Sequence, residues 1–315
     1  MRHARHTITV AAPPEVVHDV VADTEQWPVR FGPTLHVERL EHDADSERIR
    51  IWATAGDEVT SWTSRRELRP DRRTITFRQE ASQPPVAEMS GAWLLARRAD
   101  GGTDVVLEHR YRAVDDDPRS LDWIADVTDR NSRSELAALK AVAERAPGGT
   151  DGLRTGFEDS VRIAADAGRV YAFLHRAQDW PDRLPHVSRV ALEELGGVAG
   201  NPQILEMDTV TPGGAAHTTR SVRVCFDGER IVYKQTAVPP LMAAHTGEWR
   251  LTAVPGGVEV TSAHTVVVRP EAIADVLGAA ATADDALAFV RRAVGANSRV
   301  TLAHAKAFAE RGARA

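Results

Sequence analysis

Residues 6–31 read HTITVAAPPEVVHDVVADTEQWPVRF, and residues 159–184 read DSVRIAADAGRVYAFLHRAQDWPDRL. At a shift of 153 residues, Trp27-Pro28 falls on Trp180-Pro181, and the apolar positions before each pair coincide. The correspondence covers residues 6–40 and 159–193. A strand-like start, a short amphipathic segment and a Trp-Pro pair are therefore present twice in one chain.

The correspondence continues along both halves. Three further motifs recur in the same order: Gly91-Ala92-Trp93 with Gly247-Glu248-Trp249, His109 with His264, and Asn131-Ser132-Arg133 with Asn297-Ser298-Arg299. The shift drifts to 156, 155 and 166 residues, as expected if loops changed length while helices and strands were kept. Solenoid repeats are only ~20–50 residues long, so this pattern indicates a domain duplication in which each half contains the whole fold.

Composition excludes several classes of protein. The 315 residues are enough for two domains with a core each. A net charge of −6 argues against general nucleic-acid binding, and a single cysteine excludes an intrachain disulfide. The N-terminus has no apolar signal-peptide core, and no run of ~18 apolar residues occurs. We expect a cytoplasmic protein with no membrane or nucleic-acid partner.

The boundary between the halves lies at RAPGGTDG, residues 145–152, where Pro and Gly follow a helical pattern. We therefore place one domain at 1–146 and the other at 152–315. In the first, a strand at 6–11 precedes a short helix that opens at Pro13-Pro14 and ends at Trp27-Pro28. Strands are predicted at 36–41, 47–55, 58–68, 74–82, 87–98 and 103–114.

A long helix is predicted at 118–145, and the second half repeats the order with a longer final helix at about 270–312. A run of antiparallel strands followed by one long helix is an α+β pattern. We predict a curved antiparallel sheet around the C-terminal helix in each half, with a cavity where inward side chains leave space.

Alternation along 60–68 places Trp62, Ser64 and Arg66 on one strand face and charged residues on the other. An arginine among these residues either snorkels to water along its apolar stem or points into the cavity as a functional cation. Both interpretations stay open on the sequence.

The strand at 103–114 places His109 and Tyr111 on its more apolar face, and His264 holds the equivalent place in the second half. A hydrogen-bonded core histidine and a proton-transfer group both fit this pattern. In the second half, alternation along the corresponding strand places Arg220 on the face that points to the cavity. The residue that aligns with Arg66 without gaps is Val222.

Five of the seven tryptophans lie in the first half. Those shared by both halves are most simply core residues, whereas Trp52 and Trp62 either line a pocket for a flat apolar ligand or enlarge the core. No nucleophile elbow, phosphate-binding glycine loop, dinucleotide fingerprint or zinc-helix motif is present, so we expect no cofactor and no metal.

The tandem pattern, the Trp-Pro pair, SWTSRREL at 61–68 and the Asn-Ser-Arg of the last helix resemble the di-domain aromatase/cyclases of bacterial type II polyketide synthases, within the START/Bet v1-like superfamily. The resemblance implies two helix-grip domains. It also implies first-ring aldol cyclisation, dehydration and aromatisation of a poly-β-ketone, typically ketoreduced and tethered to an acyl carrier protein through phosphopantetheine.

The family's pocket arginine falls on Arg66 and its histidine on His109. We therefore take four residues as candidate catalytic groups: Arg66, His109, His264 and Arg220. Eight more are candidate substrate contacts: Trp27, Trp52, Trp62, Ser64, Trp93, Tyr111, Asn131 and Trp249. For Asn131 a helix-to-sheet structural contact is the stronger interpretation.

Two further interpretations follow from these residues. The surplus of tryptophan and the Arg66/Val222 mismatch favour the first half as the site of ring closure. Arg65, Arg69, Arg72 and Arg73 form a basic rim that would attract the acidic carrier protein. The alternative function is a binding or transport module for a lipid or aromatic ligand, since a fold alone does not imply chemistry.

Overall fold

The structure is a computed structural model, and it describes residues 1–56, 58–71, 73–145, 153–210 and 216–311. The chain divides into two compact units, Met1–Ala146 and Pro147–Ala315. Nearly all of the predicted linker at 145–152 lies outside the described residues.

The first domain begins with a strand and ends with a long helix. Its elements are β1 (Arg2–Val10), α1 (Pro14–Ala22), η1 (Thr24–Gln26), α2 (Trp27–Arg30), β2 (Thr34–His42), β3 (Ser46–Ala55), β4 (Glu58–Arg69), β5 (Thr74–Ala81), β6 (Val86–Arg97), β7 (Thr103–Ala113), η2 (Val114–Asp116) and α3 (Pro118–Ala143).

The second domain repeats this order. Its elements are β8 (Arg154–Ile163), α4 (Ala167–His175), η4 (Ala177–Asp179), α5 (Trp180–Arg183), β9 (Val187–Glu194), β10 (Gln203–Val210), β11 (Ala216–Phe226), β12 (Arg230–Ala237), β13 (Met242–Val254), β14 (Gly257–Val268), η5 (Pro270–Ala272), α6 (Ile273–Leu277) and α7 (Ala283–Arg311).

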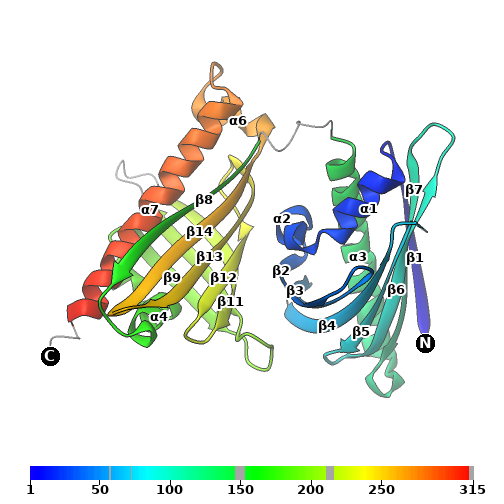
Figure 1. Cartoon of the computed structure of the whole chain (residues 1–315), viewed down its shortest axis with the longest axis horizontal. Helices are drawn as coiled ribbons and strands as arrows, with labels where there is room; N and C mark the ends of the chain where they lie inside the picture. Colours follow the sequence, from blue (N-terminus) through cyan, green and yellow to red (C-terminus); the bar gives the residue numbers. More distant parts are fainter. Residues whose placement is uncertain (57, 72, 146–152, 211–215, 312–315) are drawn as a thin grey trace. The chain divides into compact units, whose positions relative to one another are not determined.

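Each domain contains one seven-stranded antiparallel sheet, in the orders β1-β7-β6-β5-β4-β3-β2 and β8-β14-β13-β12-β11-β10-β9. The first strand pairs with the last, and the sheet curls around the long helix without closing (Figure 1). The predicted α+β fold, two tandem helix-grip domains, is confirmed.

Apolar side chains fill the space between each sheet and its helix. In the first domain Val105 and Leu107 of β7 pack with Leu136 and Leu139 of α3. In the second, Val258 and Val260 of β14 pack with Leu302 and Ala305 of α7 in the same way. Alternation along the strands explains this sidedness, because every second side chain points to the helix.

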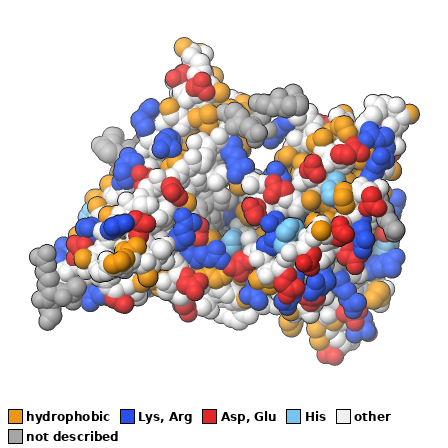
Figure 2. All heavy atoms as spheres, viewed as in Figure 1, with side chains coloured by type: hydrophobic (Ala, Val, Ile, Leu, Met, Phe, Trp, Pro, Cys, Tyr) orange, Lys and Arg blue, Asp and Glu red, His pale blue; other side chains and the backbone are white. Residues whose placement is uncertain are grey.

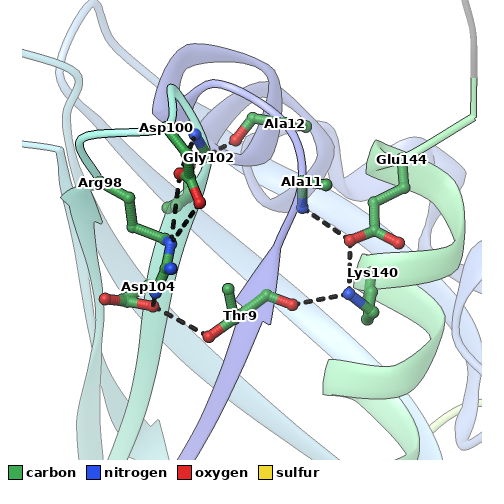
Figure 3. Close-up of polar contacts among 10 residues, drawn as sticks. Thr9, Ala11, Ala12, Arg98, Asp100, Gly102, Asp104, Lys140 and Glu144 are labelled. Atoms are coloured by element: carbon green, nitrogen blue, oxygen red, sulfur yellow. Dashed lines mark hydrogen bonds and ion pairs between the residues drawn. The ribbon is translucent and has the colours of Figure 1, made fainter.

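A polar clamp ties the end of the long helix to the first strand (Figure 3). Lys140 donates to the Thr9 carbonyl at 2.8 Å, and Glu144 accepts from the Ala11 backbone N–H at 2.6 Å. Lys306 and Glu310 form the equivalent pair of bonds in the second domain, to the Arg162 carbonyl and the Ala164 N–H. This repeated clamp fixes the position of the C-terminal end of each long helix, α3 or α7, relative to the first strand of its sheet.

The Trp-Pro prediction was wrong about where the first helix ends. The helix α1 stops at Ala22, and Trp27-Pro28 instead opens the one-turn helix α2. Proline is tolerated in a first helical turn because its missing N–H has no helical partner there. Val17, Val20 and Val21 of α1 are buried, whereas Val16 is exposed.

The second long helix is shorter than predicted. Residues 270–277 form η5 and α6, and Gly278, at φ 99°, ends that segment in a backbone conformation that glycine tolerates. Ahead of α7, Thr282 and Asp285 bond each other's backbone N–H groups, a capping box that starts a new helix.

Gly91 and Gly247 allow an aromatic ring of the neighbouring strand to lie against the sheet. A Cβ on Gly91 would overlap the Glu108 backbone oxygen and the Phe77 ring. We expect Gly91→Ala to destabilise the first domain by about 1–3 kcal/mol through overpacking. Chemical denaturation measures this, with Gly196→Ala as control, since nothing lies within 4 Å of that site. Equal effects from both variants would contradict the assignment.

Candidate active site in the two domain interiors

Arg66 lies on the inner face of β4 and is 2 % exposed. Its Nη1 donates to Glu47 Oε1 at 2.6 Å, and its Nη2 donates to the Val21 carbonyl at 2.7 Å. The Trp27 ring lies 4.7 Å from the guanidinium carbon. Burial lowers the pKa of Arg66 to about 10, so the group stays protonated at neutral pH. Arg66 is thus a buried cation neutralised by a buried carboxylate.

Arg223 is the counterpart of Arg66 in the second domain. It pairs across the sheet with Gln203 as Arg66 pairs with Glu47, and its Nη2 donates to the Leu174 carbonyl at 2.6 Å. Its guanidinium carbon lies 5.4 Å from the Trp180 ring centroid. Nη1 of Arg223 is buried and has no hydrogen-bond partner among the described residues.

The sequence prediction had placed Arg220 on the cavity face, and this was wrong. Arg220 is exposed, whereas Arg223 lines the interior. The segment from Gln203 to Arg223 is one residue longer than that from Glu47 to Arg66. A one-residue change exchanges the two faces of a strand, so the ungapped alignment places Val222 at the position of Arg66 and assigns Arg220, in place of Arg223, to the inner face.

The partner of this arginine differs between the domains. Glu47 is charged and 1 % exposed, and it also accepts from Arg39 Nε at 3.2 Å. Gln203 is neutral, and its amide engages Glu194, His175 and Cys225 instead. Within the described part of the chain, Arg223 makes no ion pair, and burial lowers its pKa. The second domain therefore holds an unneutralised cation.

A cavity of about 590 Å³ lies inside the second domain between the sheet and α7. Trp180, Leu205, Met207 and Trp249 form part of its apolar wall. Its lining also includes five buried polar atoms that have no partner among the described residues: His186 Nδ1, Arg223 Nη1, Gln235 Oε1, His245 Nδ1 and Ser298 Oγ. Buried polar atoms are normally hydrogen-bonded, so these atoms indicate a polar ligand in an apolar enclosure.

His264 is the centre of a hydrogen-bonded cluster in this cavity. Its Nδ1 lies 2.9 Å from the Tyr233 hydroxyl and 3.2 Å from His245 Nε2, and its Nε2 lies 3.0 Å from Ser262 Oγ. Burial lowers the pKa of His264 to about 4 and that of His245 to about 3. Both rings are neutral at pH 7, and His245 is the one with an unpaired nitrogen.

The first domain carries a less polar version of this cluster. Phe77 and Met89 stand at the strand positions of Tyr233 and His245, as shown by their register to Gly91 and Gly247. His109 lies 5.4 Å from the Phe77 ring, edge to face, and its Nδ1 is buried without a partner among the described residues. Burial, with smaller effects of His6 and His3, lowers the pKa of His109 to about 4.

Several predicted substrate contacts lie on the inner face but form part of the core. Trp27 and Trp62 pack on Ile49 and Ile51, and Trp93 is in the main core of the first domain. Tyr111 is 3 % exposed and packs on Ile124. These side chains form the wall of the interior, and Trp249 does the same in the second domain.

Three others are held by structural contacts. Ser64 donates its hydroxyl to the Arg78 carbonyl at 3.1 Å, and Asn131 donates to the Thr54 carbonyl at 3.1 Å. Trp52 alternates with the inward Ile51 and lies against His36, so it is on the opposite face of the sheet. The prediction that Trp52 lines the pocket was wrong.

Sequence reasoning missed Arg223, Tyr233 and His245. His245 was detectable, because His245, Gly247 and Trp249 alternate along β13 and Trp249 was already identified as inward. Tyr233 became visible only through its register to Gly247.

The predicted basic rim is largely neutralised by acids. Arg65 pairs with Glu80 at 2.9 Å, Arg69 with Glu67 at 3.3 Å, and Arg73 with Glu15 at 3.6 Å, while Arg72 lies outside the described residues. Positive and negative side chains are interspersed on the face shown in Figure 2.

A metal-binding cluster and a membrane-spanning helix are both absent from the described residues. No group of three or more His, Cys, Asp or Glu side chains is placed to hold a metal ion. None of the helices described is both long and apolar enough to cross a membrane.

Glu47→Ala tests the buried ion pair. The change leaves Arg66 buried without its counter-charge, which typically costs about 3–5 kcal/mol. We expect a large loss of first-domain stability in a denaturation experiment, whereas Glu67→Ala, at an exposed pair, has no measurable effect. A small effect of Glu47→Ala would show that Arg66 reaches water.

The buried histidines predict a pH dependence of second-domain stability. An unfolded histidine has a pKa of about 6.5, above the folded value for His264, so the unfolded state binds more protons between these values. The free energy of unfolding should therefore fall as the pH is lowered from about 6.5 to about 4, by on the order of 3 kcal/mol for His264 alone. His264→Gln should flatten this dependence in denaturation curves, and the exposed His304→Gln should not. Parallel curves for wild type and His264→Gln would contradict the assignment.

The comparisons with known proteins agree across both halves. The family described as polyketide cyclase/dehydrase and lipid transport matches residues 1–144 and 154–310. The granaticin polyketide synthase bifunctional cyclase/dehydratase of Streptomyces violaceoruber is 45 % identical over 311 residues, covering 99 % of this chain and 95 % of that protein. Its actinorhodin counterpart in Streptomyces coelicolor is 44 % identical, covering 96 % of each chain.

Two solved structures match nearly the whole chain. The di-domain ARO/CYC BexL from the BE-7585A pathway has a TM-score of 0.85 and 50 % identity, covering 98 % of this chain and 99 % of that one. The di-domain ARO/CYC StfQ from the steffimycin pathway has a TM-score of 0.85 and 35 % identity, covering 99 % and 100 %. The chain therefore belongs to the polyketide cyclase/dehydrase family, in its two-domain form.

Proposed function

We propose that this protein is a polyketide aromatase/cyclase that closes the first ring of a poly-β-ketone by aldol condensation and then removes water to form an aromatic ring. Relatives of similar length and domain arrangement, named as cyclase/dehydratases of polyketide synthases, support this function. The proposed substrate is a ketoreduced chain carried by an acyl carrier protein through phosphopantetheine. We propose that the protein works in the cytoplasm, beside the other synthase components.

One observation carries the assignment of chemistry: the unneutralised Arg223 lies in the same cavity as two neutral imidazoles and a phenol. Aldol closure requires loss of a proton from a carbon between two carbonyl groups and stabilisation of the enolate that results. A preorganised cation in a water-poor site is well suited to the developing negative charge. A neutral imidazole with an unpaired nitrogen is suited to accept the proton.

We assign each group a role that its contacts support. His245 Nδ1 accepts the proton from the substrate carbon, and Arg223 Nη1 binds the enolate oxygen. The enolate carbon attacks a second carbonyl, the new carbon–carbon bond forms, and the carbonyl becomes an alkoxide. Tyr233 protonates this alkoxide, and the proton that His245 took from the substrate passes through His264 to restore the Tyr233 hydroxyl. The apolar wall formed by Trp180 and Trp249 holds the chain bent, which favours one ring closure over others.

This proposal revises the domain assignment made from the sequence. There the first half was favoured for ring closure, because it has more tryptophans and because Arg66 has no ungapped counterpart. Arg66 is neutralised by Glu47, whereas its true counterpart Arg223 is not. The second domain is therefore the better site for enolate chemistry, and Arg66 acts as a structural ion pair.

Arg223→Met tests the proposed role of the cation. Removing one preorganised charge from such a site typically lowers kcat by about 10²–10³-fold, and we expect spontaneously cyclised shunt products to replace the natural one. The assay is product analysis after reconstitution with the synthase and carrier protein. Arg220→Met is the matched control, an exposed arginine on the same strand, and should leave the profile unchanged.

The alternative function, a carrier without chemistry, makes the opposite prediction. Under it, Arg223→Met weakens ligand binding but leaves the distribution of products the same as wild type. An unchanged product profile from a folded Arg223→Met protein would refute the proposed role.

A further inference from the structure

Glu135 is an acidic residue on the inner side of α3 that the roles described above do not use. It shares an arc of the helix with the buried Thr128, Ser132 and Leu139, because these positions recur at three- and four-residue spacing. It is half-buried, and it forms no hydrogen bond or ion pair with any other described residue. An isolated carboxyl at such a place is expensive for the fold, which points to a function.

The second domain shows what this position faces. Asn131-Ser132-Arg133 of α3 corresponds to Asn297-Ser298-Arg299 of α7, so Glu135 corresponds to Thr301. Asn297, Ser298 and Thr301 all line the cavity of the second domain. The duplicated fold therefore directs Glu135 to the interior of the first domain.

The surroundings of Glu135 favour its protonated form. Burial raises its pKa to about 7, and Arg66, the interior cation of this domain, is already paired with Glu47. About half of the Glu135 side chains then carry a proton at neutral pH. A protonated carboxyl in an apolar site is a hydrogen-bond donor and an acid, as in other enzymes whose carboxyl pKa is raised by burial.

His109 supplies the complementary group in the same interior. It is inward on β7, neutral, and its Nδ1 is buried without a partner among the described residues. His109 and Glu135 thus hold the positions whose counterparts, His264 and Thr301, line one cavity in the second domain, and they combine a neutral base with an acid where no unneutralised arginine is present. Loss of water from a β-hydroxy ketone requires this pair, because one group takes a proton from the α-carbon while another protonates the departing hydroxyl.

We propose that the first domain is the site of water loss, with Glu135 as the general acid and His109 as the base. This rests on the proposed function and divides it between the domains. In the step, the α-carbon–hydrogen bond breaks toward His109, a carbon–carbon double bond forms, and the carbon–oxygen bond breaks. Glu135 gives its proton to the hydroxyl, which leaves as water. The proton on His109 then returns to Glu135 through solvent, so no oxidant, reductant or cofactor is consumed.

The test compares two variants of the full chain, Glu135→Gln and Arg223→Met, in a synthase reconstituted with carrier protein, ketoreductase and malonyl units. Glu135→Gln keeps the shape of the side chain and removes the acid. We expect ring closure to proceed, water loss to slow by about 10²-fold or more, and a cyclised product heavier by one water to accumulate. Arg223→Met should instead lose ring closure and give shunt products.

Three controls make the outcome decisive. Asp126→Asn, an exposed acid on the same helix, should behave as wild type, and Glu135→Asp should restore part of the dehydration rate. Circular dichroism and thermal melting confirm that Glu135→Gln is folded, and we expect no loss of stability, because the change removes a buried carboxyl without a partner. Mass spectrometry distinguishes the hydrated and dehydrated products.

Normal aromatisation by Glu135→Gln would overturn the proposal, and so would the same product profile from Glu135→Gln and Arg223→Met. Failure of the proposed function has a different signature. In that case the wild-type protein itself leaves the products of the synthase unchanged.

Discussion

The joint between the first helix and the inner face of the sheet is the interaction on which each domain depends. A helix ends with carbonyl groups that lack helical partners. Val21 near the end of α1 receives bonds from Arg66 Nη2 at 2.7 Å and from Trp27 Nε1 at 3.2 Å. In the second domain Arg223 binds the Leu174 carbonyl and Trp180 binds that of Phe173. A strand arginine and the Trp-Pro tryptophan thus hold the helix over the open side of the sheet, which keeps an interior present.

This joint exists in two electrostatic forms. With Glu47 opposite, the arginine is neutralised, and the cost of burying its charge is offset by an ion pair. With Gln203 opposite, the charge stays available to a ligand. The two forms share the helix contacts and the tryptophan, so one side chain on the neighbouring strand changes the chemistry without changing the fold. Duplication of the domain allows both forms to be present in one protein.

The sequence predicted the fold well because the signals were local or repeated. Alternation in the strands, proline and glycine at turns, and the register of Trp27-Pro28 with Trp180-Pro181 were sufficient for the order of elements. The site was predicted less well, because it depends on pairing between strands. Arg223 was missed because one extra residue in the second domain exchanges the inner and outer faces of the strand. The significance of Glu47 became clear only from its pairing with Arg66 on the neighbouring strand. Trp52 was placed in the pocket by composition, although Ile51 beside it holds the inner face. Nothing local distinguishes Glu135 from any exposed helix glutamate.

Electrostatics gives a reason for two interiors. A protonated carboxylic acid and an unneutralised guanidinium cannot work within contact distance, because an opposite charge within ~4–6 Å lowers the pKa of a carboxyl by about 1–3 units and ionises it. Glu47 and Arg66 already form a buried ion pair at 2.6 Å, in which neither group is available to a substrate. Enolate formation requires the cation, and departure of a hydroxyl requires the acid. Placing Arg223 and Glu135 in different domains keeps the cation away from the acid, so each retains the charge state that its step needs. A single helix-grip interior holding both would convert them into another buried ion pair.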